Sequence, residues 1–143
     1  MSYQHILTAV DIQAENAHHL LLRSQEIAQC FSAQLHIAYV SGGINDQHDT
    51  EIYIGEQGYE VVDSHNKKRC REEMNTVLKG INIGSDNIHI LNGPIDLAVV
   101  ALAEDISANL IITAKSHALF HFLNDHSLSI DKSAKCDTLS LYE

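Results

Sequence analysis

The segment Tyr3–Asp11 reads YQHILTAVD, and its pattern is the best guide to the fold of this chain. It starts polar, continues as an apolar run and reaches Asp11 where the run ends. Such a run is typical of a strand that is buried on both faces of a parallel sheet. Ligands of open parallel sheets bind at the C-terminal ends of the strands. We therefore expect Asp11 to lie beside a crevice, so the rest of that crevice decides what it binds.

Length and composition are those of one globular domain. The chain has 143 residues, so we expect residues 1–143 to form a single domain with a proper core. No apolar run approaches the roughly 20 residues of a membrane helix, and the N-terminus lacks the pattern of a secretory signal. A formal net charge of −10 argues against nucleic acid, because phosphate contacts need a basic face. The sequence predicts a cytoplasmic protein with neither nucleic acid nor membrane as a partner.

Cysteine and histidine spacing indicates no metal site. The cysteines are Cys30, Cys70 and Cys136. They form no CxxC pair, so we expect buried free thiols. Ten histidines are more than is usual for this length, and His117 and His121 come nearest to ligand spacing, with His126 close by. No acidic residue supports them as in HExxH, so we expect no bound metal.

Apolar runs alternate with helical patterns along the whole chain. Strands are expected at His5–Val10, Gln34–Val40, Asn87–Leu91, Asn109–Ala114 and Cys136–Tyr142. Helices are expected at Glu15–Phe31, Tyr59–Lys79, Pro94–Ile106 and Ala118–Ala134; the third is apolar over much of its surface and should be well buried. The stretch from Ser41 to Gly58 begins as a loop and then becomes ambiguous.

This alternation predicts an α/β fold. It is a single doubly wound domain with a five-stranded parallel sheet of order 3-2-1-4-5 and helices on both faces. In that order the first and fourth strands flank the switch point. Asp11 should then face the Ala114–His117 turn across a crevice.

The expected crevice lacks the residues that usually receive phosphate. Glycines let backbone N–H groups approach phosphate, and a helix N-terminus adds its dipole. No glycine follows Gly93, and neither GxxxxGK[ST] nor GxGxxG is present. Lys115 and Ser116 could still meet an anion, although a polar loop that caps a helix explains them as well. Asp11 has a similar alternative, as acceptor for N–H groups of the loop before the first helix.

Catalytic patterns are equally sparse. No GxSxG elbow is present. Asp11, His117 and Ser127 contain the residue types of a triad, but nothing in their spacing constrains a shared geometry. In a histidine-rich chain a chance grouping is the favoured interpretation, so we expect no catalytic residues.

Three segments resemble the universal stress protein family over essentially the whole chain, and its A-type members more closely. YQHILTAVD is similar to the family's first strand, Y-x-x-I-L-x-A-V-D, and Ala33–Val40 is similar to A-x-L-x-x-x-x-V. Gly93–Ala114 is similar to the block G-x-x-x-x-x-I-x-x-A-x-x-x-x-x-D-L-I-V-x-G, with Asn109 where the family usually has Asp. The resemblance implies the same five-stranded fold.

The resemblance also bears on ATP. Members that bind ATP carry G-x2-G-x9-G-[ST] after the fourth strand, and the corresponding residues here are Ala114, His117, Ser127 and Leu128, which all depart from it. Asp11 and Val40, which flank the base and ribose in ATP-binding members, do match. The chain therefore looks like a member that binds no ATP. The alternative is an ATP-binding signalling switch that uses Asp11, Val40, Lys115 and Ser116.

The family dimerises, commonly through the fifth strands. Here that edge strand would present Thr138, Leu139, Ser140, Leu141 and Tyr142. Its unpaired backbone groups suit pairing with a second copy, although Ser140 makes the strand more polar than the family's P-V-L-V-V. We expect a non-enzymatic, cytoplasmic homodimer that serves the stress response through unidentified protein partners and holds no cofactor. A hydrolase or nucleotidyl transferase is the third, least favoured hypothesis.

Overall fold

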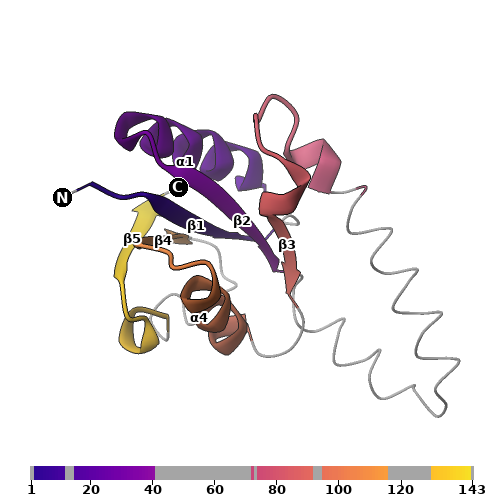
Figure 1. Ribbon diagram of the computed structural model, residues 1–143. Helices are drawn as coiled ribbons and strands as arrows, with labels where there is room; N and C mark the ends of the chain where they lie inside the picture. Colours follow the sequence, from indigo (N-terminus) through magenta and orange to yellow (C-terminus); the bar gives the residue numbers. More distant parts are fainter. Residues whose placement is uncertain are drawn as a thin grey trace, which may run out of the picture.

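The computed structural model describes residues 2–11, 15–40, 72, 74–91, 95–115 and 130–142 (Figure 1). The strands are β1 His5–Val10, β2 Gln34–Val40, β3 Ile88–Leu91, β4 Leu110–Lys115 and β5 Asp137–Tyr142. All neighbouring pairs are parallel, and the order is β3-β2-β1-β4-β5. The predicted fold class and strand order are confirmed, and each strand boundary lies within one residue of its expected position.

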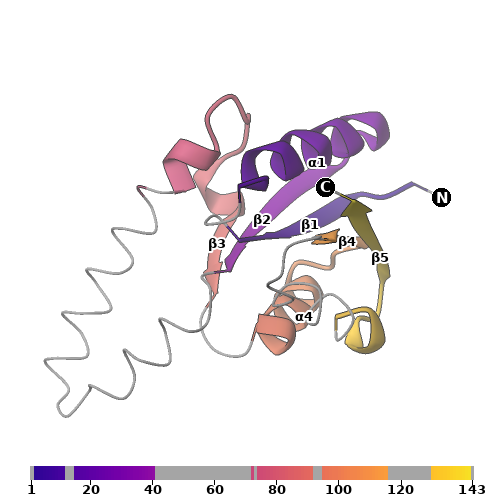
Figure 2. The same cartoon turned by 180° about the vertical axis from the view of Figure 1, so that it is seen from behind.

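Helices cover both faces of the sheet. Helix α1 (Ala17–Phe31) lies on one face and α4 (Ile95–Asp105) on the other, as Figures 1 and 2 show from opposite sides. A short 3-10 turn, η1 (Ser85–Asn87), leads into β3. Side chains alternate along each strand, so Ile6 and Val10 pack under α1 whereas Leu7 and Ala9 pack on the α4 side. The central strand β1 is therefore buried on both faces, as its apolar run predicts, whereas the edge strand β5 is largely exposed.

Helix α1 follows its apolar stripe. Its buried residues are Ala17, Leu20, Leu21, Ser24 and Ala28. The one polar member, Ser24, is satisfied because its Oγ donates to the Leu20 carbonyl at 2.8 Å. The helix ends at Phe31. The next residue, Ser32, adopts a left-handed conformation with φ 52°, and the Ala33 N–H then donates to the Ala28 carbonyl at 2.8 Å.

Two burial predictions are wrong. In α4 only one side meets the sheet: Val99 is fully buried, but Leu97 is 63% exposed, so the helix is not buried over most of its surface. Cys30 is exposed and Cys136 is half-buried, whereas buried thiols were expected; Cys70 lies outside the described residues. Leu97 and Cys30 are exposed because a helix packed on a sheet buries only one side, whereas Cys136 directly precedes the edge strand β5.

Several predicted elements lie wholly or mostly outside the described residues. These are the segment 41–58, most of the helix expected at 59–79 and most of the helix expected at 118–134. Helical residues do occur at 74–77 and 130–133, where those two helices were expected to end. Gly80 follows the first of them with φ +85°, a conformation that favours glycine. Among the described helices, none has the length and apolarity needed to cross a membrane.

Candidate functional site

The candidate crevice begins where β1 and β4 end. These two strands are neighbours in the sheet, paired from Ile6↔Leu110 to Thr8↔Ile112, while β2 lies on the other side of β1. The chain thus leaves β1 and β4 at the point where the strand order reverses, which is where open parallel sheets bind ligands. Asp11 directly follows β1 and is half-buried. The same register between β1 and β4, continued by three residues beyond Thr8↔Ile112, places Asp11 opposite Lys115.

Four predicted crevice residues fall at this edge of the sheet. Asp11 follows β1, Val40 is the last residue of β2, and Ala114 and Lys115 end β4. The remaining candidates lie outside the described residues: Ser116, His117 and Ser127. The structure therefore places these four positions at one edge of the sheet, and the crevice itself and the turn after β4 stay predictions.

Ala114 is part of the core. Its side chain is 5% exposed and belongs to the apolar cluster under α1, together with Val10, Ile112 and Leu141. This position is the first of the four that the glycine pattern would occupy. Its methyl group thus has a packing role beneath α1.

Two buried threonines near the strand ends differ in hydrogen bonding. Thr8 in β1 is fully buried, and its Oγ1 has no hydrogen-bond partner among the described residues. Thr113 in β4 is also buried, but its Oγ1 lies 3.2 Å from the Ser140 hydroxyl of β5. Burying a hydroxyl without a hydrogen bond costs free energy, so the Thr8 hydroxyl lowers the stability of the folded protein.

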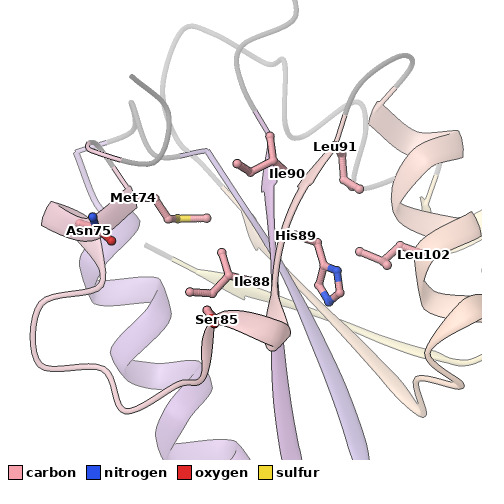
Figure 3. Close-up of a pocket in the computed structure, with 8 residues that line it drawn as sticks. All are labelled: Met74, Asn75, Ser85, Ile88, His89, Ile90, Leu91 and Leu102. Carbon is pink, nitrogen blue, oxygen red and sulfur yellow. The ribbon is translucent and has the colours of Figure 1, made fainter. Parts of the chain in front are cut away.

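A recess of about 820 Å³ lies at the outer strand β3, away from the β1–β4 crevice (Figure 3). Its described lining is Met74, Asn75, Ser85, Ile88, His89, Ile90, Leu91 and Leu102. Figure 3 shows His89, Leu91 and Leu102 on one side of β3 and Ile88 and Ile90 toward Met74 on the other. This recess could not be predicted from the sequence, because it forms only where an edge strand meets elements from distant parts of the chain.

Sequence reasoning also missed a row of histidines. His5, His36 and His89 come from β1, β2 and β3, and their rings are close neighbours. The sequence showed only that each of the three lies in a predicted strand; the register that brings them to one face is seen in the structure. Across the described parts of the chain, no group of three or more histidine, cysteine, aspartate or glutamate side chains is arranged to hold a metal ion. His117, His121 and His126 lie outside those parts.

The order of the strands defines an open parallel α/β domain, and Asp11 lies at its switch point, where domains of this kind bind ligands. The sequence profile of the universal stress protein family matches residues 2–140, and the chain belongs to that family. No curated protein gives a significant match to this sequence.

Solved structures agree on the fold. The universal stress protein UspA from Lactobacillus plantarum is 19% identical, with a TM-score of 0.64 and 99% coverage of both chains. A universal stress protein from Archaeoglobus fulgidus is 15% identical, with a TM-score of 0.60, over 98% of this chain and 94% of that one. A universal stress protein in complex with cAMP is 18% identical, with a TM-score of 0.65, over 99% of this chain and 98% of that one. At these identities the likeness concerns the fold alone.

Proposed function

We propose that this universal stress protein is an A-type member that lacks the ATP-binding motif. It acts in the cytoplasm as a non-enzymatic homodimer, through contacts with protein partners. The observation that carries the proposal is the absence of any glycine after Gly93, with Ala114 packed into the core at the first glycine position. Phosphate binding at a switch point depends on backbone N–H groups that a ligand can approach closely. Side chains replace such a cradle poorly, because ordering them costs conformational entropy.

The proposed lack of ATP binding is tested on purified protein. Nucleotide released by denaturation is measured by mass spectrometry, and ATP is titrated by calorimetry. We expect no stoichiometric nucleotide and no binding at micromolar ATP. Stoichiometric ATP, or a dissociation constant in the low micromolar range (about −8 kcal/mol), would overturn this part of the proposal.

The second candidate function is a nucleotide-dependent signalling switch. It is favoured by Asp11 at the crevice edge and by the related structure that holds cAMP. Asp11, Val40, Lys115 and Ser116 would then contact the ligand. Calorimetry with ATP and with cAMP, on wild type and Asp11→Ala, separates the two candidates: tight binding that Asp11→Ala weakens supports the switch. Turnover on a nucleotide or ester panel that Asp11→Ala removes would instead support a hydrolase or transferase.

The homodimer is proposed to form through β5. This strand is at one edge of the sheet, and two of its apolar side chains are open to solvent, Leu139 at 37% and Tyr142 at 61% exposure. An edge strand with exposed apolar residues is suited to pair with a second copy. Thr138, Ser140 and Leu141 complete the proposed interface.

Light scattering at tens of micromolar protein tests the dimer. We expect a dimer for wild type and a shift toward monomer for Leu139→Lys, because a charge on an edge strand opposes pairing. The matched control is Leu97→Lys, which changes an exposed leucine on α4 and should leave the dimer intact. A wild-type monomer, or equal effects of the two substitutions, would count against pairing through β5.

A further inference from the structure

Three histidines form a diagonal row on the α4 face of the sheet. His5 is in β1, His36 in β2 and His89 in β3, and each lies two residues further along the sheet than the one before. The ring centroids of His5 and His36 are 6.2 Å apart, and those of His36 and His89 are 5.4 Å apart. Since the strands come from distant parts of the chain, only the folded sheet assembles this row.

His36 and His89 meet through their ring nitrogens. His36 Nδ1 lies 3.2 Å from His89 Nε2, much closer than the ring centroids, so the rings meet edge to edge and not face to face. Such a contact needs one N–H donor and one lone pair. A neutral pair satisfies it, and so does a pair that carries one added proton. Two imidazolium rings would place an N–H on both nitrogens, and the contact would be lost.

The surroundings disfavour added charge. His36 is only 8% exposed and His89 is half-buried. Burial lowers the pKa of His36, and the nearby His89 and His5 lower it further. Burial also lowers the pKa of His89. His5 contributes a buried Nδ1 that has no hydrogen-bond partner among the described residues.

No described carboxylate offsets this cost. Helix α4 contributes apolar side chains to this layer, Val99, Leu102 and Ala103, and Ile106 follows directly after the helix. Its charged residues are Asp96, Glu104 and Asp105, of which Glu104 pairs with Lys135 at 3.0 Å. Asp86 of η1 is exposed, and the Cys136 thiol, whose pKa is raised by burial and by Asp137, packs at the far side of the layer. None of these groups contributes to the lowered pKa of His36 or His89.

The row ends at an accessible edge of the fold. His89 lines the recess at β3 together with Leu91 and Leu102, so water can reach its ring (Figure 3). Within the described residues β3 pairs only with β2. A positive charge on His89 would therefore weaken the packing between β3 and α4, and β3 is hydrogen-bonded to only one described strand.

We propose that His5, His36 and His89 form a proton-sensing site, in which a second proton on the row loosens β3 and α4 from the sheet. The site is separate from the β1–β4 crevice and depends on neither nucleotide nor partner. It makes the outer edge of the domain acid-labile near the pH range in which free histidines titrate.

The sign of the effect follows from linkage. In the unfolded chain each histidine takes its proton near its ordinary pKa, whereas folded His36 and His89 resist it. The stabilising contribution is thus fully present above the unfolded pKa. It is lost as pH falls from there toward the lowered folded pKa values. For each histidine that stays neutral in the folded protein, the unfolding equilibrium constant rises by up to about tenfold for each unit by which the pH falls in this range.

The test compares urea unfolding between pH 7.5 and pH 5 in wild type and in His36→Asn/His89→Gln. Asn and Gln place neutral amide groups near Nδ1 and Nε2 respectively, so the amide N–H of one can donate to the carbonyl oxygen of the other and a polar contact is retained without the titration. The control is His19→Gln, an exposed histidine on α1. We expect the double variant to lose less stability on acidification than wild type, and His19→Gln to behave as wild type.

A direct measurement covers the case of a variant that does not fold. The NMR titration of wild-type imidazole resonances should show His36 and His89 protonating below the ordinary histidine range, with the second proton entering only as β3 amides lose hydrogen-exchange protection. The proposal is overturned if both rings become charged near pH 6.5 with β3 still protected. It is equally overturned if the folded double variant and wild type show the same loss of stability on acidification.

Discussion

Replacing Thr8 by Val should stabilise this protein, although most substitutions in a core destabilise it. Thr8 is fully buried in the central strand β1, and its hydroxyl has no partner among the described residues. Valine has nearly the same shape and is also β-branched, so strand propensity and rotamer freedom change little. The substitution therefore isolates the cost of one unsatisfied hydroxyl.

The expected gain follows from that cost. A buried polar group without a hydrogen bond costs about 1–3 kcal/mol. Overpacking by the slightly larger methyl group offsets part of this in a dense core. We therefore expect a net gain of about 1–2 kcal/mol in the free energy of unfolding. For a domain of this size, that raises the melting temperature by about 3–6 °C.

Urea unfolding measures the gain, as a higher midpoint at unchanged slope. The matched control is Thr113→Val, in the neighbouring strand β4. Its hydroxyl is also buried but bonds to Ser140, so this variant should lose about 1 kcal/mol. The reasoning fails if Thr8→Val is neutral or destabilising, or if the two variants change stability in the same direction.

Three further predictions concern local chemistry. Ser32→Gly should stabilise by about 0.5–1 kcal/mol in thermal unfolding, because φ 52° at the end of α1 strains any residue but glycine; a loss would contradict this. Cys136, half-buried and with its pKa raised by burial and by Asp137, should react with a disulfide reagent more slowly than exposed Cys30; single Cys→Ser variants assign the rates, and equal rates refute the prediction. The hydrogen bond to the Asp137 carboxylate raises the pKa of Tyr3, so the difference in tyrosinate absorbance between wild type and Tyr3→Phe should titrate above pH 10; a midpoint at or below 10 argues against the bond.

Much of the fold could be predicted because its signals are local. An apolar run such as Tyr3–Asp11 specifies a strand buried on both faces, and the stripe of α1 specifies which side of that helix is covered. The strand order followed from the rules for alternating strands and helices. Burial of single residues was harder: Leu97 and Cys30 are exposed because a helix on a sheet buries only one side.

The sites could be predicted less well than the fold. Asp11 and Ala114 were placed at strand ends from the sequence, and the structure puts them there. The histidine row escaped prediction, because it depends on the offset by which Leu7 pairs with His36 and Ala38 with His89. Register is set by contacts between distant segments, and no local pattern states it.

Successive side chains of β1 point to opposite faces of the sheet. The effect of the Thr8 hydroxyl on stability and the effect of the histidine row on its pH dependence should therefore be independent. Thr8 faces the α1 side, whereas His5 and the row that it joins face the α4 side. The two sets share no hydrogen-bond partner, so their effects on stability should add within about 0.5 kcal/mol. Thr8→Val should shift the unfolding free energy equally at pH 7.5 and pH 5, while His36→Asn/His89→Gln changes its pH dependence. A triple variant measured at both pH values checks this, and a Thr8→Val gain that changes with pH would show that the two faces of β1 are coupled.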